Sequence, residues 1–153
     1  MIRTPRARRG FTMVEMITVV AFVALLASIA GLRYIDLTRE GFTSQVAGDI
    51  AVARTAVLSY YGDSEQWPAT SDLGQPPAGL APYLPGGGIF NRPRWRMAWI
   101  NIPTAPNPTL GIMVQSDDPA MMAKLVQRFG NRAPFVVAGG TITYIMSTPE
   151  SGF

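Results

Sequence analysis

The order of apolar and polar positions divides residues 11–61 into two parts. Every residue from Phe11 to Leu32 is uncharged except Glu15, and apolar side chains occur on all sides of the expected helix. A helix of this length rises about 33 Å, enough to cross a bilayer core of about 30 Å. The pattern predicts a membrane-spanning helix that contains a single carboxylate.

Beyond the apolar run, the helical pattern continues but becomes amphipathic. Charged residues enter between positions 33 and 40, whereas apolar residues recur at spacings of three or four. These apolar positions are Phe42, Val46, Ile50, Ala53, Val57, Leu58 and Tyr61. We predict one helix from about Thr12 to about Tyr61. Gly62 and Asp63 end it, and its second half (33–61) packs on a globular core.

Residues 62–93 are rich in proline and glycine, which prevents long regular structure. Apolar residues are spaced through this segment, so we expect a packed loop rather than a free linker. The expected anchors are Trp67, Leu73, Leu80, Tyr83 and Leu84.

Strand signals dominate residues 94–153. The expected strands are 94–102, 110–116, 135–138 and 141–146, and Gly139-Gly140 is a two-residue hairpin signal between the last two. A short helix at about 119–129 is capped by Asp117 or Asp118 and is followed by Gly130. We predict an α+β fold, with a long N-terminal helix packed on an antiparallel sheet of about four strands and one short inserted helix.

Positive charge is concentrated before the apolar run. The chain has 153 residues and a formal charge of +3, and removing the four leader arginines leaves −1. Those arginines are Arg3, Arg6, Arg8 and Arg9. Basic residues on this side of a span hold the N-terminus in the cytoplasm, so we expect a single pass that sends the C-terminus across the membrane.

Cysteine and histidine are both absent. Their absence excludes disulfides and thiolate metal sites, and it removes the commonest general base. We therefore expect no enzyme activity and no cofactor.

The junction between the basic leader and the apolar run has a distinctive order. Gly10 is followed by Phe11, Thr12 and then Glu15. This arrangement closely resembles the prepilin signal of type IV pilins and type II secretion pseudopilins. The resemblance implies that prepilin peptidase cuts between Gly10 and Phe11, which removes residues 1–10, and that the new Phe11 amine is methylated.

The same resemblance implies a structural subunit of a type IV pilus or a pseudopilus. Such a subunit leaves the inner membrane through an assembly platform and joins a homo-oligomeric helical filament, which is extracellular or periplasmic. Residues 11–32 would then line the filament core, where the carboxylate of Glu15 pairs with the methylated amine of Phe11 in its own or an adjacent subunit. A buried pair of this kind suits the setting of register, because losing one partner is costly.

Other interpretations of the N-terminus stay open. Residues 27–31 could supply the cleavage site of an ordinary secretory signal, and an unprocessed signal anchor is also possible. Neither accounts for Glu15. A minor pilin or a membrane-anchored binding protein, working in tip adhesion or DNA uptake, is the alternative of a different class. The chain also lacks the cysteine-closed C-terminal loop of many surface pilins.

Two further groups are candidate binding residues. Arg92, Arg94 and Arg96 alternate with apolar residues, so a strand would place three guanidiniums on one face for DNA phosphates. A solvated strand face is the favoured interpretation, since the chain without its leader is not basic. Asp117 and Asp118 are candidate calcium ligands, but a helix cap is simpler because calcium needs six or more oxygen ligands.

Overall fold

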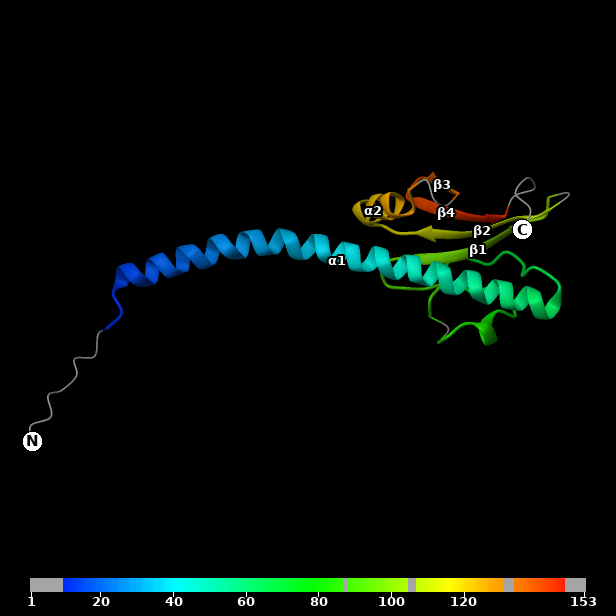
Figure 1. The fold of residues 1–153 in the computed structure, drawn as a ribbon, viewed down its shortest axis with the longest axis horizontal. Coiled ribbons are helices and arrows are strands. Elements are labelled where there is room, and N and C mark those ends of the chain that lie inside the picture. The colour runs from blue at the N-terminus through cyan, green and yellow to red at the C-terminus, as the bar shows by residue number, and fades with distance from the viewer. Residues whose placement is uncertain (1–9, 87, 105–106, 131–133, 148–153) are drawn as a thin grey trace, which may run out of the picture. The chain divides into compact units, whose positions relative to one another are not determined.

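The computed structural model describes residues 10–86, 88–104, 107–130 and 134–147. The basic leader predicted at 1–10 therefore lies outside the described residues, apart from Gly10. The chain forms two units, Met1–Thr38 and Arg39–Phe153, and one helix, α1 (Met13–Ser64), contributes to both (Figure 1). The single long helix expected from about Thr12 to about Tyr61 is confirmed.

In the first unit, α1 is exposed on all sides. Residues 13–37 are all solvent-exposed, and α1 is long and apolar enough to cross a membrane. Its serine and threonine hydroxyls bond within the helix: Thr18 Oγ1 donates to the Val14 carbonyl at 2.8 Å, and Ser28 Oγ donates to the Ala24 carbonyl at 2.9 Å. Because these hydroxyls have partners inside the helix, they add little cost in an apolar environment.

In the second unit, α1 contributes one face to the core. Four predicted positions are fully or nearly fully buried: Val46, Ile50, Ala53 and Val57. Leu58 and Tyr61 do not belong to this face, since they are 40% and 39% exposed, whereas Tyr60 packs against the core. The helix also continues through Gly62 and Asp63, so these residues do not end it as predicted. It ends at Ser64, and Glu65 turns the chain with a φ of 53°.

The four expected strands form one antiparallel sheet in the order β1-β2-β4-β3. They are β1 (Arg96–Ile102), β2 (Thr109–Gln115), β3 (Phe135–Ala138) and β4 (Thr141–Ser147). The register of β2 on β4 shifts between Leu110 and Gly111. A Cβ at Gly111 would lie 3.0 Å from the Tyr144 carbonyl oxygen, so glycine allows this close approach of two strands. The α+β fold is confirmed.

Gly139 and Gly140 form the hairpin turn between β3 and β4. Their φ values are 52° and 76°, both in the region that a two-residue hairpin of this kind requires.

The proline- and glycine-rich segment is a packed loop, as expected. It runs along the outer side of β1, where the Ser71 and Gly74 backbone N–H groups donate to the Trp99 and Met97 carbonyls at 3.0 and 2.8 Å. Its anchors Leu80 and Leu84 are buried on either side of a 3-10 turn at Ala81–Tyr83. One edge of the sheet is therefore closed by the chain itself.

A second helix, α2 (Pro119–Phe129), completes the core beside the sheet (Figure 1). Met121, Met122 and Leu125 are buried, and the Phe129 ring lies 6.0 Å from the rings of both Phe135 and Tyr144. The core therefore joins α1, the loop, the sheet and α2 within residues 39–147.

Candidate functional site

The carboxylate of Glu15, in the apolar half of α1, is hydrogen-bonded to Thr12, three positions earlier in the chain. Glu15 Oε2 accepts hydrogen bonds from the backbone N–H and the hydroxyl of Thr12, both at 2.9 Å, and Thr12 Oγ1 accepts from the Glu15 N–H at 3.2 Å. This reciprocal arrangement is a capping box, which satisfies helix donors that otherwise have no partner. It turns the Glu15 carboxylate toward the beginning of α1.

Gly10 and Phe11 lie immediately before this cap and are exposed, with Phe11 73% exposed. The carboxylate of Glu15 is exposed as well, and a carboxylate accepts more hydrogen bonds than the two that Thr12 donates. The hydrogen bonds between Thr12 and Glu15 were not predicted. The spacing Thr-x-x-Glu before an apolar run is the signal that would have found them.

The arginine-rich segment does not have the predicted arrangement. Strand β1 begins only at Arg96, so the expectation of three guanidiniums on one strand face is wrong. The chain turns before the strand, because Ser116 Oγ donates to the Arg94 carbonyl at 2.7 Å and the Arg92 N–H donates to the Trp95 carbonyl at 3.0 Å.

Arg92 is committed to an acid on α1. Its Nε and Nη2 donate to the two carboxylate oxygens of Asp49 at 3.1 and 3.2 Å, a bidentate pair. Asp49 is 7% exposed, and the hydrogen bonds from Arg92 to this carboxylate raise the pKa of the guanidinium above its usual range. The pair fastens the loop to α1.

The other two arginines have different surroundings. The Arg94 guanidinium carbon lies 4.4 Å from the centre of the Phe42 ring, a cation–π contact. All three arginines line a hollow of about 320 Å³, together with Ser116 and Asp117. The three arginines thus border one hollow, although they do not align on a strand and the Arg92 guanidinium is bonded to Asp49.

Asp118, not Asp117, caps α2. Its Oδ1 accepts from the backbone N–H groups of Ala120 and Met121 at 3.0 and 3.1 Å, and Arg39 Nε donates to Oδ2 at 3.4 Å. The hydrogen bond from Met121 lowers the pKa of Asp118, with a smaller lowering from Arg39, whereas burial opposes both. The carboxylate is thus used in folding, and no group of three or more potential metal ligands occurs in the part of the chain that the structure describes.

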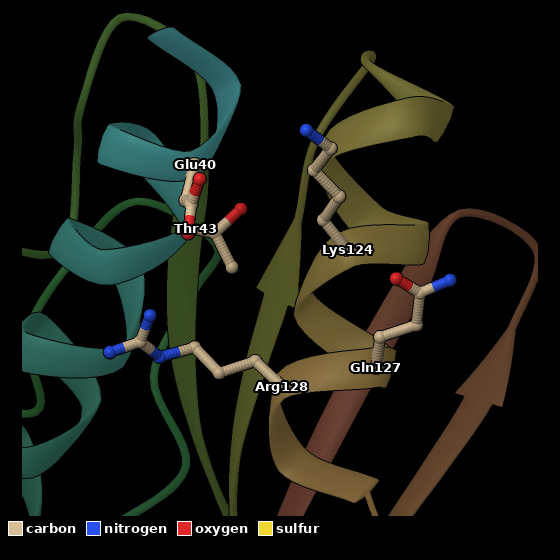
Figure 2. A pocket seen from close by; sticks show the side chains of 5 residues that line it. All are labelled: Glu40, Thr43, Lys124, Gln127 and Arg128. Atoms are coloured by element: carbon tan, nitrogen blue, oxygen red, sulfur yellow. The ribbon is translucent and has the colours of Figure 1, made fainter. Parts of the chain in front are cut away.

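A second hollow, of about 390 Å³, lies between α1 and α2 (Figure 2). Glu40 and Thr43 of α1 line one side, and three polar residues of α2 line the other. These are Lys124, Gln127 and Arg128. Figure 2 shows the Arg128 side chain extending toward α1, where its Nη1 donates to Ser44 Oγ at 2.9 Å. No local sequence pattern predicts this hollow, since its two sides are about 80 residues apart along the chain.

The curated relatives of this chain are type IV pilins and fimbrial proteins. The chain is 39% identical over 51 residues to the type IV major alpha-pilin of Moraxella bovis, a match covering 33% of this chain and 32% of that protein. It is 31% identical over 81 residues to the fimbrial protein EcpC of Eikenella corrodens, covering 53% and 50%. The type IV major pilin protein PilE1 of Neisseria gonorrhoeae is 29% identical over 76 residues, covering 48% and 46%.

These matches span a third to a half of each relative's length. No family model and no solved structure matches the chain. The resemblance to the type IV pilin family that rested on Gly10, Phe11 and Glu15 is therefore supported by the relatives as well as by the pilin-like fold.

Proposed function

We propose that this chain, whose relatives are type IV pilins and fimbrial proteins, is a structural subunit of a type IV pilus or pseudopilus filament. Prepilin peptidase removes residues 1–10 and leaves Phe11, methylated on its amine, as the first residue. The subunit waits in the inner membrane with its N-terminus on the cytoplasmic side. An assembly platform then moves it into a homo-oligomeric filament outside the cell or in the periplasm.

The observation that carries this proposal is the first half of α1. Every residue from 13 to 37 is exposed, and large apolar side chains such as Val20, Leu26 and Ile29 are 58–64% exposed. Exposed apolar surface of this extent indicates a membrane or an apolar partner. A lipid bilayer covers it before assembly, and the same segments of neighbouring subunits cover it in the filament.

Glu15 supplies the register of that packing. Insertion scales put a carboxylate at the bilayer centre at about 2.5–3.5 kcal/mol, which favours a cationic partner. Cleavage after Gly10 creates such a cation at Phe11, four residues from Glu15. Thr12 acts as a positioning residue, since its two hydrogen bonds already direct the carboxylate toward that end of the helix.

A minor pilin at the filament tip is the second candidate. The observation that favours it is the hollow lined by Arg92, Arg94 and Arg96, three basic residues of one short segment. If the chain is a minor pilin, it should be a scarce component of sheared filaments and should bind an anionic polymer such as DNA. The bidentate use of Arg92 by Asp49 leaves fewer free donors for that purpose.

Replacing Glu15 tests the assembly role. Glu15→Leu should leave the chain in the membrane fraction but reduce its amount in sheared filaments at least tenfold, because the Phe11 amine loses its partner. Met16→Leu, an apolar change at the next position, is the matched control and should assemble normally. Normal filament yield from Glu15→Leu would overturn the assembly role.

The processing step has its own test. Intact-mass measurement on protein from cells with an active prepilin peptidase should find methylated Phe11 as the first residue. Gly10→Leu should keep the leader attached. An N-terminus near Gly31 would instead indicate an ordinary secretory signal, and an unprocessed wild-type chain would indicate a signal anchor.

A further inference from the structure

One end of the second unit carries a cationic helix face. Helix α2 contains two basic residues, Lys124 and Arg128, and no acidic residue. The two lie four positions apart, which places them on the same side of the helix. Both line the hollow of about 390 Å³ against α1, where Glu40 is the single acidic residue (Figure 2). The side chains around this hollow therefore carry one net positive charge.

The segment at the far end of α1 has the opposite charge. Residues 55–91 contain three acidic residues and no lysine or arginine. They are Asp63, Glu65 and Asp72, and all three are exposed. Asp63 accepts a hydrogen bond from the Tyr83 hydroxyl at 2.7 Å, whereas Glu65 and Asp72 make no ion pair with any residue in the described ranges. Glu65 stands at the turn that follows the last residue of α1.

The two charged regions cannot meet within one chain. Arg128 bonds to Ser44, and α1 continues from there for twenty more residues to Ser64. At about 1.5 Å per residue this helix separates the two regions by about 30 Å. Complementary charges at opposite ends of a rigid unit favour a contact between two copies, and a contact of different surfaces continues into an open filament.

We propose that the α1–α2 hollow is a docking site for a second copy of this chain, and that the acidic end around Glu65 of one copy enters the hollow of the next. Lys124 and Arg128 hold the incoming carboxylate, and the Gln127 amide and the Thr43 hydroxyl offer further hydrogen bonds. Glu40 weakens the contact and limits its strength. This inference rests on the proposed filament, and it adds a head-to-tail contact between globular units that is separate from the Phe11–Glu15 pair.

Charge exchange between the two ends tests the contact. In full-length protein in the native assembly system, Arg128→Glu and Glu65→Arg should each lower the yield of sheared filaments about tenfold, because like charges then face each other. The double variant should recover most of the wild-type yield. Arg54→Glu, a reversal on the exposed side of α1 outside both regions, is the matched control and should assemble normally.

The absence of cysteine allows a second, independent measurement. Oxidation of filaments from Glu65→Cys/Lys124→Cys should give a ladder of covalent multimers, since each copy offers both surfaces. Neither single variant should give a ladder. A disulfide within one copy is excluded by the separation of about 30 Å, because Cα atoms more than about 7 Å apart cannot be bridged.

The outcomes separate this inference from the filament proposal. Filaments of wild-type yield from both single reversals, together with no ladder from the cysteine pair, would overturn the docking site and leave the filament intact. Single cysteine variants that cross-link into dimers would also overturn it, because they would indicate a symmetric contact. A wild-type chain that forms no filaments at all would instead contradict the proposed function.

Discussion

The two halves of α1 are one continuous helix, but they have opposite relations to the rest of the protein. Residues 13–37 bury no side chain and keep their serine and threonine hydroxyls bonded within the helix. Residues 39–64 bury Val46, Ile50 and Val57 and hold the loop through Asp49. The second half is thus buried against its own chain, whereas the first half leaves its apolar surface uncovered. One helix can therefore pack on a folded unit along one half and expose apolar surface along the other.

The largest expected effect is a loss of stability from truncating a buried side chain in the second half of α1, compared with an exposed one in the first half. Ile50→Ala should lower the free energy of unfolding by about 2–5 kcal/mol, because Ile50 is 4% exposed and its loss leaves a cavity. Ile29→Ala, at a site that is 58% exposed, should change it little. Denaturant unfolding of the detergent-solubilised protein, followed by tryptophan fluorescence, measures both. Equal losses from the two variants would contradict the contrast between the halves.

The next effect concerns two arginines that contact the second half of α1. Arg92→Ala should cost about 1.5–3 kcal/mol, the range for hydrogen bonds to a charged group, because it leaves the nearly buried Asp49 carboxylate without its bidentate partner. Arg94→Ala should cost less than about 1 kcal/mol, since it removes a cation–π contact at an exposed site. The same unfolding measurement ranks them. A larger loss from Arg94→Ala would show that the loop is fastened differently.

A smaller effect, with a pH dependence, is expected at the cap of α2. Asp118→Ala should cost about 0.5–2 kcal/mol near neutral pH, whereas Asp117→Ala should be close to neutral. The pKa of Asp118 is lowered in the folded protein by the Met121 N–H, so its contribution is complete above the ordinary aspartate pKa of about 3.9. That contribution is lost as pH falls through the lower folded value. The difference between wild type and Asp118→Ala should therefore shrink below about pH 4; a constant difference would contradict the cap's ionised state.

The smallest expected effect is at the first turn of α1, where Thr12 and Glu15 form the capping box. Thr12→Val removes the hydroxyl of the capping box and should loosen the first turn of α1 by at most about 1 kcal/mol, without changing the unfolding of the second unit. Faster amide hydrogen exchange at residues 13–16 in detergent micelles would record it. Thr18→Val, whose hydroxyl bonds only to the Val14 carbonyl, is the control. If the amide hydrogen exchange rates at residues 13–16 are unchanged in Thr12→Val, then the Thr12 hydroxyl does not position Glu15.

Much of the fold followed from periodicity and turn chemistry. The long helix, the four strands and the Asp118-capped helix are all present within a few residues of the expected bounds, because repeated apolar spacing and paired glycines are strong local signals. The end of α1 was predicted about three residues too early. Gly62 and Asp63 remain helical, since both residues tolerate helical backbone angles. The apolar face of α1 that packs on the core ends with Tyr60 and does not include Tyr61.

The charged side chains were the hardest to predict. Arg92 pairs with an acid 43 positions away, and the α1–α2 hollow joins residues about 80 positions apart, so no local pattern indicates either. The acid at Glu15 could be identified from its apolar surroundings. Its hydrogen bonds with Thr12 could have been predicted from the capping-box spacing Thr-x-x-Glu. The same residues also belong to the leader pattern, which accounts for them in another way.

Electron cryomicroscopy of sheared filaments from cells producing the wild-type chain tests the central claim most directly. We predict subunits that begin at Phe11, with residues 13–37 bundled along the filament axis and Glu15 within about 2.7–3.2 Å of a Phe11 nitrogen. A filament with this helix half on its outer surface, or with the Phe11 amine far from every Glu15, would contradict the claim that one exposed helix half and its single acid build the assembly.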